Sequence, residues 1–182
     1  MSVTIKDDDK VFKKFLSDLK ELKSLETIVG PTVEPSKPKK SKDGSDILLY
    51  AAANEFGAQI TVTDKMRRYL HAIGLHLKKS TTQIEIPERS FMRSTFDKTA
   101  VIDKVMKRLQ RFLNKMIDGK SNPIDVMGGI GDAMVSEIKS TITSNVAPEN
   151  AEFTIKQKGT GKGTLFASGS LLKSISRLVK KK

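Results

Sequence analysis

The chain has 182 residues, no cysteine, and a formal net charge of +12 from 33 basic and 21 acidic side chains. This length can enclose a core without disulfides or metals, so we expect one domain over residues 1–182. The composition excludes disulfides, thiolate catalysis and cysteine zinc sites, and no apolar run is long enough to span a bilayer. The acidic N-terminal stretch lacks a signal-peptide core, so we expect a soluble protein made in the cytoplasm.

The first third of the chain predicts a helix, a strand, a basic loop and a second helix. Residues 7–26 have acids at their start and apolar residues at three- and four-residue spacing, which is typical of an amphipathic helix; "SVTI" before them fits a short strand. "TIVGPTV" predicts a strand broken at Gly30-Pro31, and residues 34–45 predict a flexible basic loop. "DILLYAAANEFG" then predicts a helix capped by Asp46 and ended by Gly57.

The middle of the chain predicts two short strands around an amphipathic helix. "AQITVT" and "TTQIEIP" are strand patterns, the second stopped by Pro87, and residues 64–79 between them predict the helix.

Two long adjacent helices follow. One begins at Ser94 or Thr95 and ends at Asp118, before Gly119, with an apolar stripe from Val101 to Ile117 and bases on its other faces. The next follows "SNP", with Pro123 in its first turn and glycines that would allow close packing. Its stripe is predicted at Ile124, Met127, Ile130, Met134, Ile138 and Ile142.

The last third of the chain carries basic loops and a final strand. Residues 157–167 form a Gly/Lys-rich loop, "SGSLLKSISRLV" predicts a short turn and then a strand, and residues 179–182 form a basic tail. The expected fold class is α+β: a small mixed or antiparallel sheet packed against two long helices, with exposed basic loops.

No motif in the chain supports catalysis or a cofactor. "KGTGKGT" lacks the spacing and the following helix of a phosphate loop, and "MGGIGD" sits inside a helical pattern rather than after a strand. His71 and His76 are five residues apart, which does not fit a helical zinc pair. We therefore expect no enzyme activity, no cofactor, no metal and no small-molecule substrate.

Three segments occur in an order that resembles the bacteriophage tail-completion or minor tail proteins, the virion morphogenesis and head–tail joining family. They are "YAAANEFGA" (50–58), "IPERSFMRSTFD" (86–97) and "ASGSLLKSISRLV" (167–179). The resemblance implies a structural virion protein that forms a ring, commonly a hexamer, in the neck or at the top of the tail. Its implied partners are other copies of itself and neighbouring neck, tail-tube or sheath proteins, with no membrane. The motif or subunit-interface positions that it implies are Asn54, Glu55, Phe56, Gly57, Pro87, Arg89, Phe91, Arg93, Gly169, Leu171, Ser174 and Ile175.

Residues 86–97 are then interpreted as a joint. Pro87 ends a strand, Phe91 anchors the turn, and Glu55 is a plausible acidic partner for Arg89 or Arg93. We expect the aromatic residues, Phe56 included, to lie in the core and at least one arginine to lie at a subunit interface.

The charge leaves a second function open: a basic accessory protein that binds DNA without reading its sequence. Residues 148–182 hold eight bases against two acids, although a solubilising tail explains that as well. In a neck ring the two functions overlap, because lysine-rich loops facing the lumen would touch genomic DNA. The candidate contacts are Lys37, Lys39, Lys40, Lys42, Lys158 and Lys162.

Overall fold

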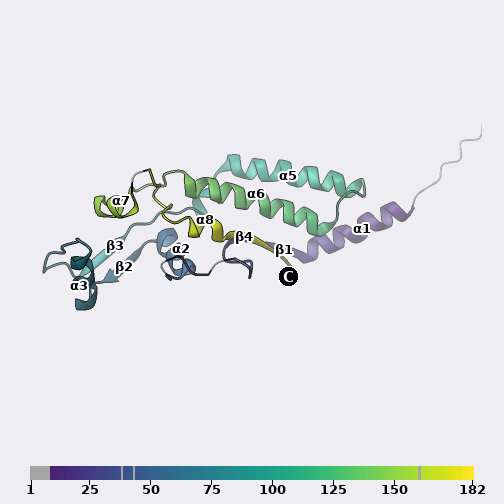
Figure 1. The fold of residues 1–182 in the computed structure, drawn as a ribbon. Coiled ribbons are helices and arrows are strands. Elements are labelled where there is room, and N and C mark those ends of the chain that lie inside the picture. The colour runs from purple at the N-terminus through teal and green to yellow at the C-terminus, as the bar shows by residue number, and fades with distance from the viewer. Residues whose placement is uncertain (1–8, 38, 43, 160) are drawn as a thin grey trace, which may run out of the picture.

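The chain folds as an α+β protein with its helices in the majority (Figure 1). The structure is a computed structural model that describes residues 9–182 apart from 38, 43 and 160. The eight helices of this described part are α1 (Asp9–Ser24), α2 (Ile47–Phe56), α3 (Asp64–Ala72), α4 (Arg93–Phe96), α5 (Thr99–Ile117), α6 (Pro123–Thr143), α7 (Glu152–Lys158) and α8 (Ser170–Ser174). The strands are β1 (Leu25–Pro31), β2 (Ala58–Thr61), β3 (Gln83–Ile86) and β4 (Ile175–Lys181).

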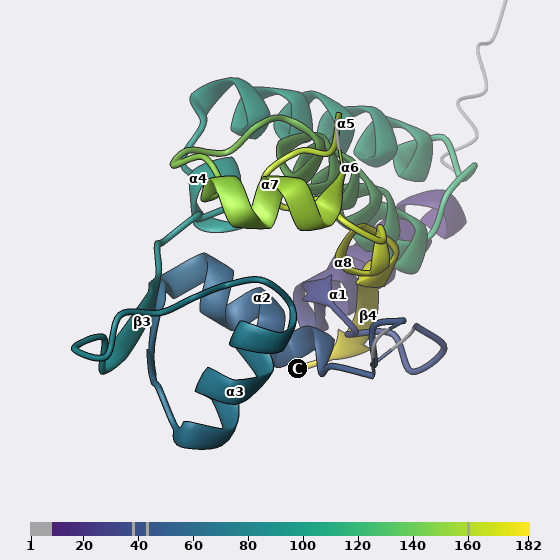
Figure 2. The ribbon, with the colours of Figure 1, turned by 60° about the vertical axis from the view of Figure 1, so that its left-hand side comes forward.

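The strands form two separate antiparallel pairs rather than the single small sheet expected from the sequence. β1 pairs with β4 along their full length, from Leu25 opposite Lys181 to Pro31 opposite Ile175. This pair packs on α6, so it joins two segments that are far apart in the sequence to the longest helix. β2 and β3 pair only with each other, in a small lobe that also contains α3 (Figure 2).

α5 and α6 form the predicted pair of long adjacent helices. Glycines in α6 allow its neighbours to approach closely, as the sequence indicated. A Cβ atom added at Gly129 would meet the ring of Phe112 on α5, with Cζ only 2.5 Å away. A Cβ at Gly131 would lie 2.6 Å from Cδ of Arg177 on β4, so α6 is closely packed on two sides.

Helix ends lie where capping residues were found in the sequence. The Asp46 carboxylate accepts hydrogen bonds from the amides of Leu48 and Leu49, and Gly57 ends α2 with φ 75°. Asn122 and Asp125 form a capping box at the start of α6, with Pro123 in the first turn.

Three sequence-based boundaries were wrong. The strand before the basic loop continues through Gly30 and ends at Pro31, because Gly30 stays paired with Ser176. The helix predicted over residues 64–79 ends at Ala72, because Gly74 takes φ 93° and its amide bonds the carbonyl of His71. The long helix predicted from Ser94 or Thr95 is two helices, α4 and α5, separated by extended backbone at Lys98.

Several predicted apolar stripes include residues that are exposed rather than buried. Ile124, the first residue of the predicted α6 stripe, is exposed, as are Ile102 and Met106 on α5. α3 has no buried residue. The predicted strand "SVTI" and the acids Asp7 and Asp8 lie outside the described residues.

Candidate functional site

The three motif segments of the sequence meet in one core. Phe91 is fully buried and packs in a cluster with Ala51 of the first segment and with Leu171 and Ile175 of the third. Ile138 and Ile142 of α6 complete the cluster's contact with the long helices. Segments more than 100 residues apart therefore form one structural unit, and Phe91 is the core residue that the sequence predicted.

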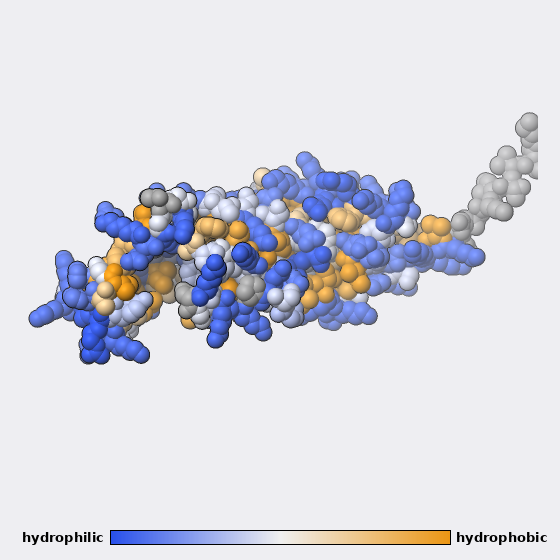
Figure 3. Space-filling model, in the orientation of Figure 1, coloured by the Kyte–Doolittle hydropathy of each residue, from blue (hydrophilic) through white to orange (hydrophobic). Residues whose placement is uncertain are grey.

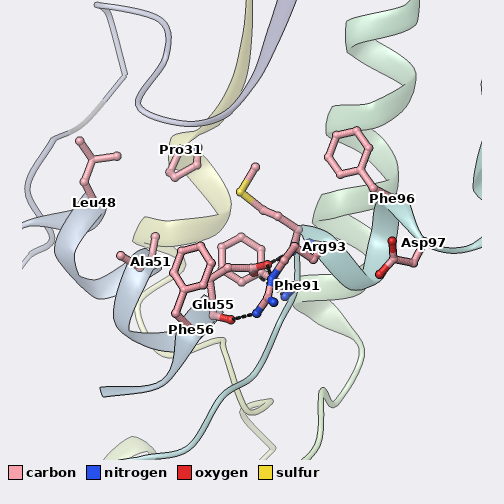
Figure 4. Close-up of a pocket in the computed structure, with 11 residues that line it drawn as sticks. Pro31, Leu48, Ala51, Glu55, Phe56, Phe91, Arg93, Phe96 and Asp97 are labelled. Atoms are coloured by element: carbon pink, nitrogen blue, oxygen red, sulfur yellow. Dashed lines mark hydrogen bonds and ion pairs between the residues drawn. The ribbon is translucent and has the colours of Figure 1, made fainter. Parts of the chain in front are cut away.

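Glu55 holds the turn at residues 90–93. Its carboxylate accepts hydrogen bonds from the backbone amides of Phe91 (2.8 Å), Met92 (2.9 Å) and Arg93 (2.9 Å), and from the Ser90 hydroxyl (2.8 Å). The side chain lies at the last turn of α2, which places it directly under these amides (Figure 4). One carboxylate thus fixes the turn that delivers Phe91 to the core.

The hydrogen bonds also decide the protonation of Glu55. Burial raises the pKa of this carboxyl, but the amides of Met92 and Arg93, the Ser90 hydroxyl and the amide of Phe91 together outweigh burial. The net effect leaves the pKa below its ordinary value. Glu55 is therefore a buried carboxylate that stays ionised at neutral pH.

Arg93 is the arginine that pairs with Glu55. Its Nε lies 3.3 Å from the Glu55 carboxylate, and its Nη2 donates to the Glu55 carbonyl (2.8 Å) and to Glu88 (2.7 Å). Its guanidinium also lies over the Phe56 ring, 4.9 Å from the centroid. About half of the Arg93 side chain is exposed, so it remains available to a second surface.

Arg89 faces the interior. It is 6% exposed, its amide donates to the Asn54 carbonyl (2.6 Å), and its guanidinium donates to the carbonyls of Pro148 and Glu149 (2.8 and 3.0 Å). Burial lowers the pKa of this guanidinium, although Tyr50 counteracts the effect. Arg89 therefore ties the motif turn to the loop after α6 within one subunit.

The remaining motif positions have structural roles inside the subunit. Asn54 is buried and its side-chain amide donates to the Tyr50 carbonyl (2.8 Å). A Cβ at Gly57 would lie 3.2 Å from the Ile86 carbonyl oxygen, where β2 turns past β3, and Pro87 follows β3 directly. Gly169 precedes α8 with φ 74°, and the buried Ser174 hydroxyl donates to the Leu171 carbonyl.

Phe56 does not lie in the core, contrary to the prediction. It is 65% exposed at the end of α2. α2 is apolar on nearly all of its faces, which is typical of a fully buried helix. Here Leu48, Leu49 and Phe56 are exposed instead. The sequence carried no signal of this exposure, because a helix that is apolar on nearly all faces predicts burial.

An open apolar groove of about 530 Å³ lies beside the motif turn. Its floor contains Ala51 and Phe91, and its rim contains Leu48, Phe56 and Phe96 from α2 and α4 (Figure 4). Pro31 at the end of β1 closes one side. A groove with three large exposed apolar side chains at its rim is suited to a protein segment.

The candidate DNA-contacting lysines differ in their surroundings. Lys39, Lys40, Lys42 and Lys162 are exposed, and Lys37 lies 3.7 Å from Glu34. Lys158 differs from these, because it is half-buried and its ammonium donates to the carbonyls of Gly163 and Thr164. Burial, followed by the nearby charge of Arg89, lowers the pKa of Lys158.

A row of basic side chains on α5 was not among the candidate DNA contacts chosen from the sequence. The exposed side chains are Lys107, Arg108, Arg111 and Lys115. Lys104 in the same row bonds Glu137 of α6 (3.0 Å). Charge at helical spacing on one exposed face was the signal that could have identified this row.

Comparisons with protein families, with curated proteins and with solved structures found no match to this chain. Within residues 9–182, gaps aside, no group of acidic or histidine side chains is arranged to hold a metal ion. No helix in the same residues combines the length and apolarity needed to cross a membrane.

Proposed function

We propose that the protein is a structural component of a bacteriophage virion, of the neck or tail-completion type, which assembles as a ring at the head-proximal end of the tail. The observation that carries the proposal is the convergence of the three motif segments on one core around Phe91. Segments chosen by their resemblance to this family form a single joint, held by Glu55. A joint of this kind positions a groove and a half-exposed arginine at the surface, which is what an assembling subunit needs.

Exposed apolar side chains also support assembly. Within the described residues, large apolar side chains are exposed on α1, α2, α4 and α5. Figure 3 shows such side chains on the projecting end of the molecule at α1 and between the polar regions of the body. Isolated soluble monomers seldom leave so much apolar surface uncovered.

Electron microscopy and virion composition test this proposal. The purified protein, alone or with tail tubes, is expected to form rings of uniform diameter, and mass spectrometry of purified virions is expected to detect the chain. A protein that is monomeric at every concentration and absent from virions would overturn the proposal. The number of subunits in the ring, six in the resembled family, follows from the same images.

The basic row on α5 favours a second candidate function, non-specific DNA contact. A depression of about 240 Å³ between α5 and α6 is lined by Lys104, Lys107, Arg108 and Arg111, with Glu137 as its one acidic residue. Such a surface binds the nucleic-acid backbone without reading its bases.

Salt dependence of duplex binding tests the DNA contact. The double variant Lys107→Glu, Arg111→Glu is expected to reduce the slope of log affinity against log salt by about 1.8, because each lost phosphate contact removes about 0.9. The matched variant Lys78→Glu, Lys79→Glu, at exposed lysines between α3 and β3 that belong neither to the basic row nor to the candidate loop contacts, is expected to leave that slope unchanged. Absence of binding at about 50 mM salt would exclude this function.

A further inference from the structure

The structure has two uncovered apolar surfaces that fit each other but lie apart in one subunit. One is the groove beside the motif turn, with Leu48, Phe56 and Phe96 at its rim. The other is the exposed face of α1, with Phe12 (62% exposed), Leu16 (42%) and Leu19 (37%). We propose that α1 of one subunit lies in the groove of a second copy of the chain. This inference rests on the proposed ring and specifies the contact that builds it.

The apolar stripe of α1 is wider than its contact within the subunit requires. Phe15 and Leu22 are half-buried on the side that contacts α6, which leaves Phe12, Leu16 and Leu19 on the adjacent face. These three residues have the spacing i, i+4, i+7, which is the pattern with which an amphipathic helix enters an apolar groove. The exposed part of this stripe therefore gives α1 the pattern of a helix that docks into an apolar groove.

α1 cannot reach the groove of its own subunit. It continues directly into β1 at Leu25, and the last residue of β1, Pro31, lines the groove. A seven-residue strand spans about 20 Å, and α1 then extends away from the body (Figure 1). An α1 that lies in the groove must therefore come from another chain.

Charge at the two surfaces is complementary although the whole chain is strongly basic. Lys20 and Lys23 are exposed four residues after Leu16 and Leu19, so they flank the outer part of the stripe. Asp97 lines the groove, is exposed, and makes no ion pair with any described residue. Arg93 in the groove is already paired with Glu55 and Glu88. The basic flank of α1 is thus complementary to the unpaired carboxylate of Asp97 at the apolar groove, which favours this helix over an acidic one.

The contact joins two different patches, so it is heterologous. Such contacts repeat head to tail and close into a ring when the rotation permits. A single helix in a groove buries less than the roughly 800 Å² per partner of a standard interface. Closure, in which every subunit makes the contact twice, then supplies the stability that one contact lacks.

A mixing experiment tests the contact. Leu16→Glu removes a docking helix and Phe96→Glu removes a groove, and both positions are exposed, so each variant is expected to fold. Each variant alone is expected to require at least about tenfold more protein for half-assembly in sedimentation velocity, because a charge replaces an apolar contact at the centre of the interface. An equimolar mixture is expected to form dimers that stop there, since only one intact helix and one intact groove can meet. Ile155→Glu, at a similarly exposed apolar position on α7, is the matched control and is expected to assemble like the wild type.

Cross-linking provides a direct readout of the same contact. The chain has no cysteine, so the double variant Leu19→Cys, Phe96→Cys has no background thiols. Oxidation is expected to give a ladder of covalent oligomers, whereas either single variant gives at most a dimer.

The outcomes separate this inference from the ring itself. Rings that form normally with Leu16→Glu overturn the α1 contact and leave the proposed function standing. Loss of assembly in Phe96→Glu but not in Leu16→Glu also overturns it, because the groove then receives another segment or another protein. A wild-type chain that forms neither rings nor the cross-linked ladder overturns both.

Discussion

Glu55 shows how one buried charge can organise a turn. A carboxylate that accepts three amide hydrogen bonds is stable in a buried position because each donor replaces a lost water. Glu55→Gln keeps the shape but places an amide group among donors. We expect the free energy of unfolding to fall by about 3 kcal/mol, measured by urea denaturation. Glu88→Gln, at an exposed carboxylate, is the control and should cost about 0.5 kcal/mol. Equal losses in the two variants would contradict this role.

The lowered pKa of Glu55 makes stability depend on pH in one direction. In the unfolded chain the carboxyl titrates near its ordinary value of 4.5, whereas in the folded chain it titrates lower. As pH falls below about 4.5 the unfolded state binds the proton first, so the stabilisation present at neutral pH is lost toward the lower, folded pKa. The stability gap between wild type and Glu55→Gln should therefore narrow from pH 6 to pH 3. Urea titrations that give the same gap at every pH would refute it.

Arg89 and Arg93 look equivalent in the sequence but differ in their surroundings. Arg89→Met should lower the free energy of unfolding by about 3 kcal/mol, because it leaves the carbonyls of Pro148 and Glu149 without their charged donor. Arg93→Met should cost about 1 kcal/mol, since its ion pairs are half-exposed. Thermal denaturation of the two variants checks the ranking. The sequence-based expectation that at least one arginine lies at a subunit interface therefore now applies to Arg93.

Close packing of α6 predicts a strong effect from a small substitution. Gly129→Ala places a methyl group against the Phe112 ring, and we expect a loss of about 2 kcal/mol in the free energy of unfolding despite the better helix propensity of alanine. Phe112→Leu removes the ring atoms in question, so the double variant should be more stable than the sum of the single losses. Ser136→Ala, at an exposed position of the same helix, should be close to neutral. A neutral Gly129→Ala would show that α5 moves away without cost.

Element boundaries were predictable where a side chain caps or breaks a helix. Asp46, Gly57 and the Asn122-Pro123 pair mark the ends of α2 and the start of α6, because their chemistry acts locally. The break between α4 and α5 was missed because residues 95–99 contain no glycine or proline that would mark it. The Thr95 hydroxyl is hydrogen-bonded to the Phe91 carbonyl and to the Thr141 hydroxyl of α6. The contact with Thr141 is long-range, so the local pattern of the sequence does not encode it.

The site was predictable only in part for a related reason. An acidic residue and two arginines in separate motifs indicated an ion pair, and Arg93 with Glu55 confirms it. The three amides that Glu55 binds carry no sequence signature, since every non-proline residue has the same donor. The apolar pattern likewise identifies the faces of α1 and α2 without naming their partner, so Phe56 was assigned to a core that it does not enter.

At the scale of the whole molecule, stability should decrease from the long helices toward the lobe. α6 contributes buried residues along its length and contacts α5, β1 and β4, whereas α3 contributes none and β2 pairs only with β3. Local opening requires less free energy where few apolar contacts are broken. Amides of α3 should therefore exchange with deuterium at least about a hundredfold faster than those in the middle of α6, as measured by mass spectrometry of peptides. Assembly provides a second comparison, because a ring built through α1 and the groove should protect amides in α1, α2 and α4 while α3 stays fast. Equal protection of lobe and helices in the isolated chain would show that the lobe is held by contacts stronger than its burial implies.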